Sequence, residues 1–358
     1  MIRTLADAWL HDLSPFALRF TETIGIRWYG LAYAMGFLLG YLALRALARR
    51  RVVLIPAHRC GDAMLAVIVG VVVGGRLGYV LFYEPSLLWD FSGAAPWWGV
   101  LAVQRGGMAS HGGIIGVIIA AWRISRGWKL PDGTIEGRCS PLHAMDVVAA
   151  LAPIGLFLGR LANFVNGELL GRVVASPGEP APWWAVRFPQ EVVSGHQSFR
   201  TDAQERALDG LVRGQMLPEE AWAHAYDRIV DTIQGGGAEG RRLAAELAPL
   251  LSARYPSQLL QAAGEGIVLG AALWLIWARP RKPGVVGSWF MIIYGAQRVL
   301  TEFVRLPDAH LQVQRVLGFS RGQWLSVLMV VIGIVALVAI RRSKAAPVGG
   351  WRSRRGPP

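Results

Sequence analysis

Seven long apolar runs divide this chain into segments that could cross a membrane. A helix needs about 20 apolar residues to span the hydrocarbon core of a bilayer. The runs cover residues 28–47, 64–83, 107–122, 143–166, 258–278, 285–304 and 323–340. The third run is short and interrupted by glycines, which is typical of a helix that packs inside the protein or lines a cavity. The pattern predicts an all-α, polytopic integral membrane protein with seven transmembrane helices.

The composition supports this class. Hydrophobic residues make up 53% of the chain and charged residues 17%, and the mean hydropathy is +0.36, which is more apolar than a soluble domain. The net charge of +13 comes from short Lys and Arg clusters between the apolar runs, which favours contact with anionic membrane lipids and not with nucleic acid. The two cysteines lack metal-ligand spacing, so we expect neither a metal nor a cofactor.

The basic clusters also predict the orientation. In the short connections, one side together with the C-terminal tail carries 18 Lys and Arg residues, against 7 on the other side when the long loop 172–255 is left out. The N-terminus is therefore expected outside and the C-terminus inside. The predicted parts are an outer segment 1–27, four helices in 28–171, an outer loop 172–255, three helices in 256–340 and a basic inner tail 341–358. Helix-prone pieces alternate with glycines in 198–253, which predicts a helical periplasmic cap. The tail beyond Ser343, rich in Arg, Gly and Pro, is predicted to be disordered.

One polar stretch stands out at the end of the fourth run. Gly159–Arg172 reads GRLANFVNGELLGR and places Arg160, Asn163 and Glu168 at membrane depth, where ionisable groups are costly and usually functional. The fork of an arginine guanidinium matches phosphate oxygens, so we interpret the stretch as the floor of a site for a lipid headgroup. The alternative is that Arg160 pairs with Glu168 or Asp146 and only locks helices together.

The sixth run carries a second polar stripe. Tyr294, Arg298 and Glu302 are spaced four residues apart, so they share one helical face. If Arg298 faces Arg160, the two form a clamp for a phosphodiester. The alternative is a structural ion pair between Arg298 and Glu302 within one helix.

The third run contains GGMASHGG, with His111 between glycines. Imidazole is the usual side chain for proton transfer near neutral pH, so His111 is the candidate general base. A lone histidine that only packs between helices is the alternative. Other polar residues in the runs include Tyr29, Arg76, Gln258 and Glu265; taken singly, each is better interpreted as structural.

Taken together, these motifs resemble the prolipoprotein diacylglyceryl transferase family of the bacterial inner membrane. The matching segments occur in the family's order: IRWYGLAYAMGF, GGRLGYVLFY, GGMASHGG, GRLANFVNGELLGR, YPSQL and YGAQRVLTEFVRLPD. The resemblance implies transfer of diacylglyceryl from phosphatidylglycerol to the lipobox cysteine in the signal peptide of a preprolipoprotein, with a thioether formed and glycerol phosphate released.

The resemblance also implies residue roles. The matching positions comprise the catalytic candidates His111, Arg160 and Arg298, and the substrate-binding candidates Tyr29, Asn163, Glu168, Gly171, Tyr294 and Glu302.

The chain departs from the family in two motifs. Ala109 and Ser110 before His111 differ from the usual serine and bulky residue. Tyr255 stands where the family commonly has a histidine before the proline of YPSQL, and Leu260 and Gln261 stand where it has tyrosine and glutamate. The 198–253 segment also looks longer than usual.

The residues alone leave two other functions open. One is a transporter or channel with a charged path, which the absence of visible internal repeats disfavours. The other is a non-catalytic membrane scaffold.

Overall fold

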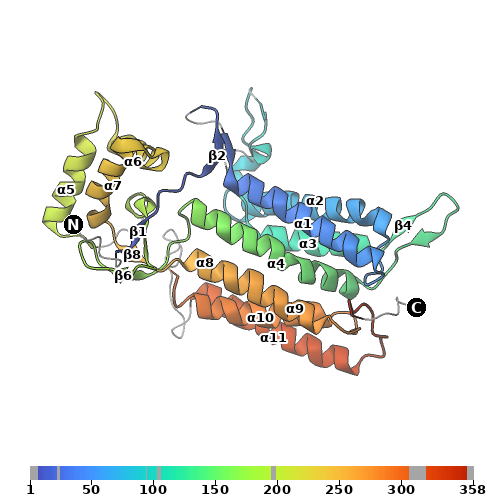
Figure 1. Cartoon of the computed structure of the whole chain (residues 1–358). Coiled ribbons are helices and arrows are strands. Elements are labelled where there is room, and N and C mark those ends of the chain that lie inside the picture. The colour runs from blue at the N-terminus through green and yellow to red at the C-terminus, as the bar shows by residue number, and fades with distance from the viewer. Residues whose placement is uncertain are drawn as a thin grey trace. The chain divides into compact units, whose positions relative to one another are not determined.

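Helices dominate the computed structural model (Figure 1), which describes residues 7–21, 25–93, 95–102, 106–194, 199–305 and 320–352. A helix lies at each of the seven predicted apolar runs. These helices are α1 (Trp28–Arg49), α2 (Cys60–Phe82), α3 (Ser110–Ser125), α4 (Pro141–Val165), the continuous group α8 (Ser257–Gln261), a π-helical turn (Ala262–Val268) and α9 (Leu269–Ile276), then α10 (Val285–Thr301) and α11 (Arg321–Arg342).

By length and composition, five of these segments could cross a membrane, as in a multi-pass helical membrane protein. They are 28–49, 57–82, 141–165, 257–276 and 322–342. The remaining two helices, α3 with 16 residues and α10 with 17 residues, are shorter than a full span. The short third helix agrees with the glycine-broken run in the sequence.

The described chain forms two compact units. Unit 1 comprises residues 1–35, 155–268 and 294–328, and unit 2 comprises 36–154, 269–293 and 329–358. The boundaries between the units fall inside α1, α4, α10 and α11, and between the π-helical turn and α9. Most candidate site residues belong to unit 1, whereas His111 belongs to unit 2.

Short strands correct the all-α prediction. Unit 1 contains a four-stranded sheet in the order β1 (Trp9–Leu10), β7 (Val186–Arg187), β8 (Ala253–Arg254), β6 (Val173–Ala175), and a pair formed by β2 (Phe16–Arg19) and β3 (Gly25–Arg27). In unit 2, β4 (Trp128–Lys129) pairs with β5 (Ile135–Glu136). Each strand has two to four residues, which is too short to leave an alternating pattern in the sequence.

The insertion in unit 1 is helical, as predicted. It consists of α5 (Asp202–Arg213), α6 (Trp222–Gly235) and α7 (Gly237–Leu247), which lie together in Figure 1. Thr201 and Gln204 form a reciprocal capping box that starts α5, an arrangement that satisfies two orphan backbone donors. Buried Val212, Tyr226 and Leu247 join the three helices in one apolar core.

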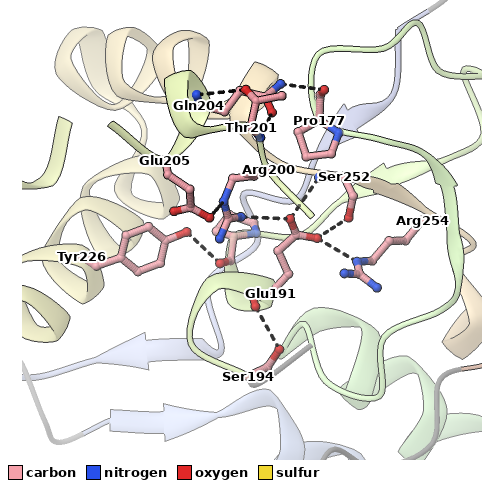
Figure 2. Close-up of polar contacts among 11 residues, drawn as sticks. Pro177, Glu191, Ser194, Arg200, Thr201, Gln204, Glu205, Tyr226, Ser252 and Arg254 are labelled. Carbon is pink, nitrogen blue, oxygen red and sulfur yellow. Dashed lines mark hydrogen bonds and ion pairs between the residues drawn. The ribbon is translucent and has the colours of Figure 1, made fainter. Parts of the chain in front are cut away.

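A buried carboxylate ties this insertion to the sheet (Figure 2). Glu191 accepts hydrogen bonds from the Ser252 amide at 3.0 Å, from the Ser252 hydroxyl and from Arg254 Nε at 2.8 Å. Arg254 Nη1 also donates to the carbonyl of Gly171 at 3.1 Å. The network therefore reaches from the insertion to the end of the GRLANFVNGELLGR stretch.

Three further contacts complete the network (Figure 2). Arg200 lies 3.7 Å from Glu191 and donates to Glu205 at 2.9 Å, and the Tyr226 hydroxyl donates to the carbonyl of Pro189 at 2.7 Å. Glu191 has no exposed surface. A buried charge is tolerated only when it is paired and hydrogen-bonded, which is the case here.

The C-terminal tail is ordered as far as residue 352, so the prediction of disorder is wrong for that part. Val348 forms an isolated bridge with Arg281. The Trp351 indole donates to the carbonyl of Trp274 at 2.6 Å. Both contacts lie within unit 2. The remaining tail residues, 353–358, are outside the described residues.

Candidate active site

A buried ion pair lies at the centre of the candidate site. Arg160, on the last turns of α4, donates through Nε to Glu265 Oε2 at 2.8 Å. The Arg160 side chain is 15% exposed and that of Glu265 is 0% exposed. Glu265 belongs to the π-helical turn, a feature often found at functional sites. Because this bond uses Nε, the two terminal guanidinium nitrogens of Arg160 remain available for other acceptors.

The two partners considered for Arg160 from the sequence are both wrong. Asp146 lies in unit 2, where its carboxylate accepts from the backbone amides of Gly284 and Gly287 at 2.7 Å each. It therefore caps the start of α10. Glu168 accepts instead from the Asn166 side chain at 3.2 Å.

Tyr294 brings the two predicted arginines to one place. Its hydroxyl hydrogen-bonds the Arg160 guanidinium and also interacts electrostatically with Glu265 and Arg298. Arg298 Nη1 is buried and has no hydrogen-bond partner among the described residues. A guanidinium hydrogen-bonded to Tyr294, with a second guanidinium near the same hydroxyl that keeps a free donor, suits an anion with several oxygens.

Tyr29 joins this group from α1. Its hydroxyl interacts electrostatically with Arg160 and Glu168, and its ring lies 5.2 Å from that of Tyr33. Asn163, one helical turn beyond Arg160, is 7% exposed. The structure thus assembles residues from α1, α4, the π-helical turn and α10 within unit 1.

The backbone after α4 takes a strained path. Gly167 and Leu169 both have left-handed φ angles, +65° and +57°. A non-glycine residue in that region costs about 1–2 kcal/mol. Ser257 Oγ donates to the carbonyl of Leu169 at 3.0 Å, and Gln258 Nε2 donates to that of Glu168 at 2.5 Å. Side chains at the start of α8 therefore hold this loop in place.

Gly171 and Glu302 lie at the edge of the site. A Cβ on Gly171 would come within 3.0 Å of Tyr255 Cβ, so the close approach requires glycine. Glu302 follows the end of α10, and its Oε1 accepts from Ser320 Oγ at 2.9 Å. The described residues include no ion pair between Glu302 and Arg298, so the structural ion pair considered from the sequence is not formed.

His111 is positioned in unit 2 by the packing of α3 on α2. A Cβ on Gly78 of α2 would lie 2.6 Å from Gly112 Cα, so the two helices touch through glycines, as is typical inside membranes. The Ala109 amide donates to the Gly75 carbonyl at 2.9 Å. His111, the second residue of α3, is exposed.

Arg76 holds the connection that leads to His111. Its guanidinium donates to the carbonyls of Gly99, Val100, Gly106 and Gly107 at 2.6–3.0 Å. These hydrogen bonds all go to the backbone, which agrees with the structural interpretation of Arg76 from the sequence.

Glu265 is the functional candidate that the sequence interpretation undervalued. The sequence shows Glu265 as a carboxylate inside an apolar run. The spacing of residues along its own helix does not show that it faces Arg160 on α4. Within the described residues, no group of three or more His, Cys, Asp or Glu side chains could hold a metal ion. The site therefore consists of arginines, carboxylates, amides and tyrosines.

These features define a multi-pass helical membrane protein with a buried arginine-rich site suited to an anionic headgroup. The sequence profile of the family described as "Prolipoprotein diacylglyceryl transferase" matches residues 15–339. The chain belongs to this family.

Relatives named phosphatidylglycerol–prolipoprotein diacylglyceryl transferase support the assignment. The one from Bdellovibrio bacteriovorus is 41% identical over 96% of this chain and 97% of its own length. The one from Neisseria gonorrhoeae is 36% identical over 93% of this chain and 98% of its own length. The one from Burkholderia thailandensis is 36% identical over 90% of this chain and 94% of its own length.

Proposed function

We propose that this protein transfers the diacylglyceryl group of phosphatidylglycerol to the lipobox cysteine of a preprolipoprotein, the first step of lipoprotein maturation. The names of the relatives supply the two substrates, and membership of the family supplies the reaction class. The observation that carries the proposal is the buried Arg160–Glu265 pair beside Arg298, whose Nη1 has no partner among the described residues. Such a site suits a phosphodiester inside a membrane.

In the proposed reaction, the cysteine sulfur forms a bond to the glycerol carbon of the diacylglyceryl group. The bond from that carbon to the phosphate oxygen breaks, and both electrons leave with glycerol phosphate. The leaving phosphate gains a second negative charge, which Arg160 and Arg298 stabilise. Fixed cations placed where charge develops lower the barrier strongly.

His111 is the proposed base. A cysteine thiol is mostly protonated at neutral pH, and only the thiolate is a good nucleophile. The proton passes to the imidazole as the carbon–sulfur bond forms. Tyr29, Asn163 and Glu168 are proposed to orient the lipid.

Gly171, Tyr294 and Glu302 complete the proposed binding residues. Tyr294 positions Arg160 through its hydroxyl. Gly171 allows the close approach of the chain at Tyr255, and Glu302 accepts a hydrogen bond from Ser320, just before α11.

We also propose the membrane topology that the basic clusters predict. α3 and α10 complete seven spans, with the N-terminus and the insertion in the periplasm and the C-terminus in the cytoplasm of a bacterial inner membrane. Lys and Arg residues concentrate on the cytoplasmic side of such proteins, and 18 of them fall on the side assigned to the cytoplasm. The insertion would then cap the outer face, where the preprolipoprotein arrives.

The test is transfer by the purified protein. Incubation with phosphatidylglycerol and a lipobox peptide should add one diacylglyceryl mass to the cysteine in a mass spectrum, and a peptide with serine in place of cysteine should stay unmodified. Arg298→Ala should lower kcat by about 10²- to 10³-fold, the loss typical of a removed charge-stabilising donor. Absence of the added mass with the unaltered protein would overturn the proposal.

The matched control is Arg213→Ala. Arg213 forms an exposed ion pair with Asp209 on α5, far from any proposed role in the reaction. Surface pairs of this kind contribute little to stability. Loss of activity in Arg298→Ala together with full activity in Arg213→Ala would assign the effect to the site.

A further inference from the structure

One face of the segment from Ser257 to Glu265 is polar and completely buried. Ser257, Gln258, Gln261 and Glu265 are each 0% exposed. Ser257 and Gln258 donate to the loop after α4, and Glu265 accepts from Arg160. Gln261 follows Gln258 by three residues and precedes Glu265 by four, so it lies between them on the same face.

Several polar atoms on this face have no partner among the described residues. They are both amide atoms of Gln261, Oε1 of Gln258 and Oε1 of Glu265. An unpaired buried polar group costs about 1–3 kcal/mol. Buried polar atoms in native proteins are nearly always satisfied, by protein, by water or by a ligand. The concentration of four such atoms on one buried face next to Arg160 therefore indicates a ligand site.

The chemistry of these atoms differs from that of the arginines. Arginine only donates hydrogen bonds and so suits phosphate oxygens. The unpartnered atoms on this face are three oxygens, which accept, and one amide nitrogen. Whichever way the Gln261 amide is turned, it presents both an acceptor and donors. Such a surface suits hydroxyl groups, which donate one hydrogen bond and accept others.

We propose that Gln261, with the free oxygens of Gln258 and Glu265, binds the hydroxyl groups of the terminal glycerol of phosphatidylglycerol. This inference rests on the proposed function and assigns the headgroup specificity of that reaction. Glu265 joins the two halves of the site, because one carboxylate oxygen holds Arg160 and the other faces the hydroxyls. Gln261 and Glu265 are one helical turn apart, about 5 Å along the axis, which a three-carbon alcohol can span.

The test compares two lipids in each preparation. Phosphatidylpropanol has the same phosphodiester, charge and three-carbon alcohol as phosphatidylglycerol, but no hydroxyl on that alcohol. The unaltered protein should use phosphatidylglycerol about 10- to 100-fold better in kcat/KM, the range expected when buried polar groups lose their partners. Because the ratio is taken within one preparation, the fraction of folded protein cancels.

Variants assign the preference to Gln261. Gln261→Leu should reduce the ratio to about 3-fold or less, and Gln261→Glu should keep most of it, since a carboxylate also accepts from hydroxyls. Gln234→Leu on α6 is the control and should leave the ratio unchanged. If Gln261→Leu yields too little protein, Gln261→Asn, with its shortened amide, should lower the ratio in the same direction.

Three results would overturn the proposal. The first is an unaltered protein with no preference between the lipids, and the second is a Gln261→Leu protein that keeps the full preference. The third is a Gln261→Leu protein that loses kcat/KM equally with both lipids, which would indicate a structural or water-binding role. Absence of transfer from either lipid by the unaltered protein would instead overturn the proposed function itself. The two failures are therefore distinguishable.

Discussion

Removal of Glu265 should destabilise the protein more than removal of the whole ion pair. At the 2.8 Å separation of Arg160 Nε and Glu265 Oε2, the attraction is about 6 kcal/mol for an effective dielectric constant of about 20. Glu265→Leu discards this attraction and leaves the guanidinium buried. Loss of one partner from a buried pair costs about 3–5 kcal/mol, so this single variant should be markedly less stable.

The double variant Arg160→Leu with Glu265→Leu should recover most of that stability. Replacement of a buried ion pair by apolar side chains is often neutral or stabilising, because neither charge has to be taken out of water. The same double variant should have no transferase activity, since the proposed phosphate ligand is gone. The double variant should thus regain stability without regaining transfer.

Two measurements check this reasoning. Thermal unfolding of each variant in one detergent gives the order of stability, and transfer to a lipobox peptide gives the activity. Glu265→Gln, which keeps the shape but not the charge, should fall between the unaltered protein and Glu265→Leu in stability. A double variant less stable than Glu265→Leu would refute the ion-pair argument. A double variant with normal transfer would refute the role of Arg160.

Three further predictions concern other parts of the molecule. His111→Gln should abolish transfer at pH 7 but leave the unfolding temperature within about 2 °C, because the side chain is exposed. Gly171→Ala should lower both stability and transfer, by about 1–3 kcal/mol in stability, because its Cβ would press on Tyr255. Burial lowers the pKa of His11 below its ordinary value of 6.5. The unfolded chain therefore binds more protons below pH 6.5, so stability should decrease there, by at most about 1.4 kcal/mol per pH unit.

Each of these has its own check. A His111→Gln protein that still modifies the peptide would exclude this imidazole as the base. Gly171→Ser, with a still larger side chain, should be at least as impaired as Gly171→Ala, and the reverse order would contradict the steric argument. His11→Gln should flatten the dependence of unfolding temperature on pH between 7.5 and 5.5. An equally steep curve in that variant would assign the dependence to another group.

Hydropathy was sufficient to locate the helices along the chain, but it could not show which helices pack against one another. All seven apolar runs are helices, and the short third run corresponds to the 16-residue α3. Spacing along one helix also grouped Arg298 with Tyr294, and the two side chains interact electrostatically in the structure. The partner of Arg160 could not be found in this way, because Glu265 lies 105 positions away in the chain. Only the packing of α4 against the π-helical turn brings them together.

The four-residue spacing of Arg298 and Glu302 shows where pattern reasoning fails. It predicts an intrahelical pair only if the helix continues through both residues. α10 ends at Thr301, so Glu302 leaves the helical path and its carboxylate accepts from Ser320. The position of a helix end depends on the residues that follow and on tertiary contacts, neither of which the spacing contains.

The strained loop and the polar face of α8 are parts of one arrangement. Left-handed residues such as Leu169 persist only where surrounding contacts hold them, and here Ser257 and Gln258 supply those contacts to the carbonyls of residues 169 and 168. One and two turns further on, the same face carries Gln261 and then Glu265, which holds Arg160. A rotation of this helical segment would therefore release the loop and displace the arginine together. Through this segment, the polar side chains of Ser257 and Gln258 are mechanically linked to the Arg160–Glu265 pair.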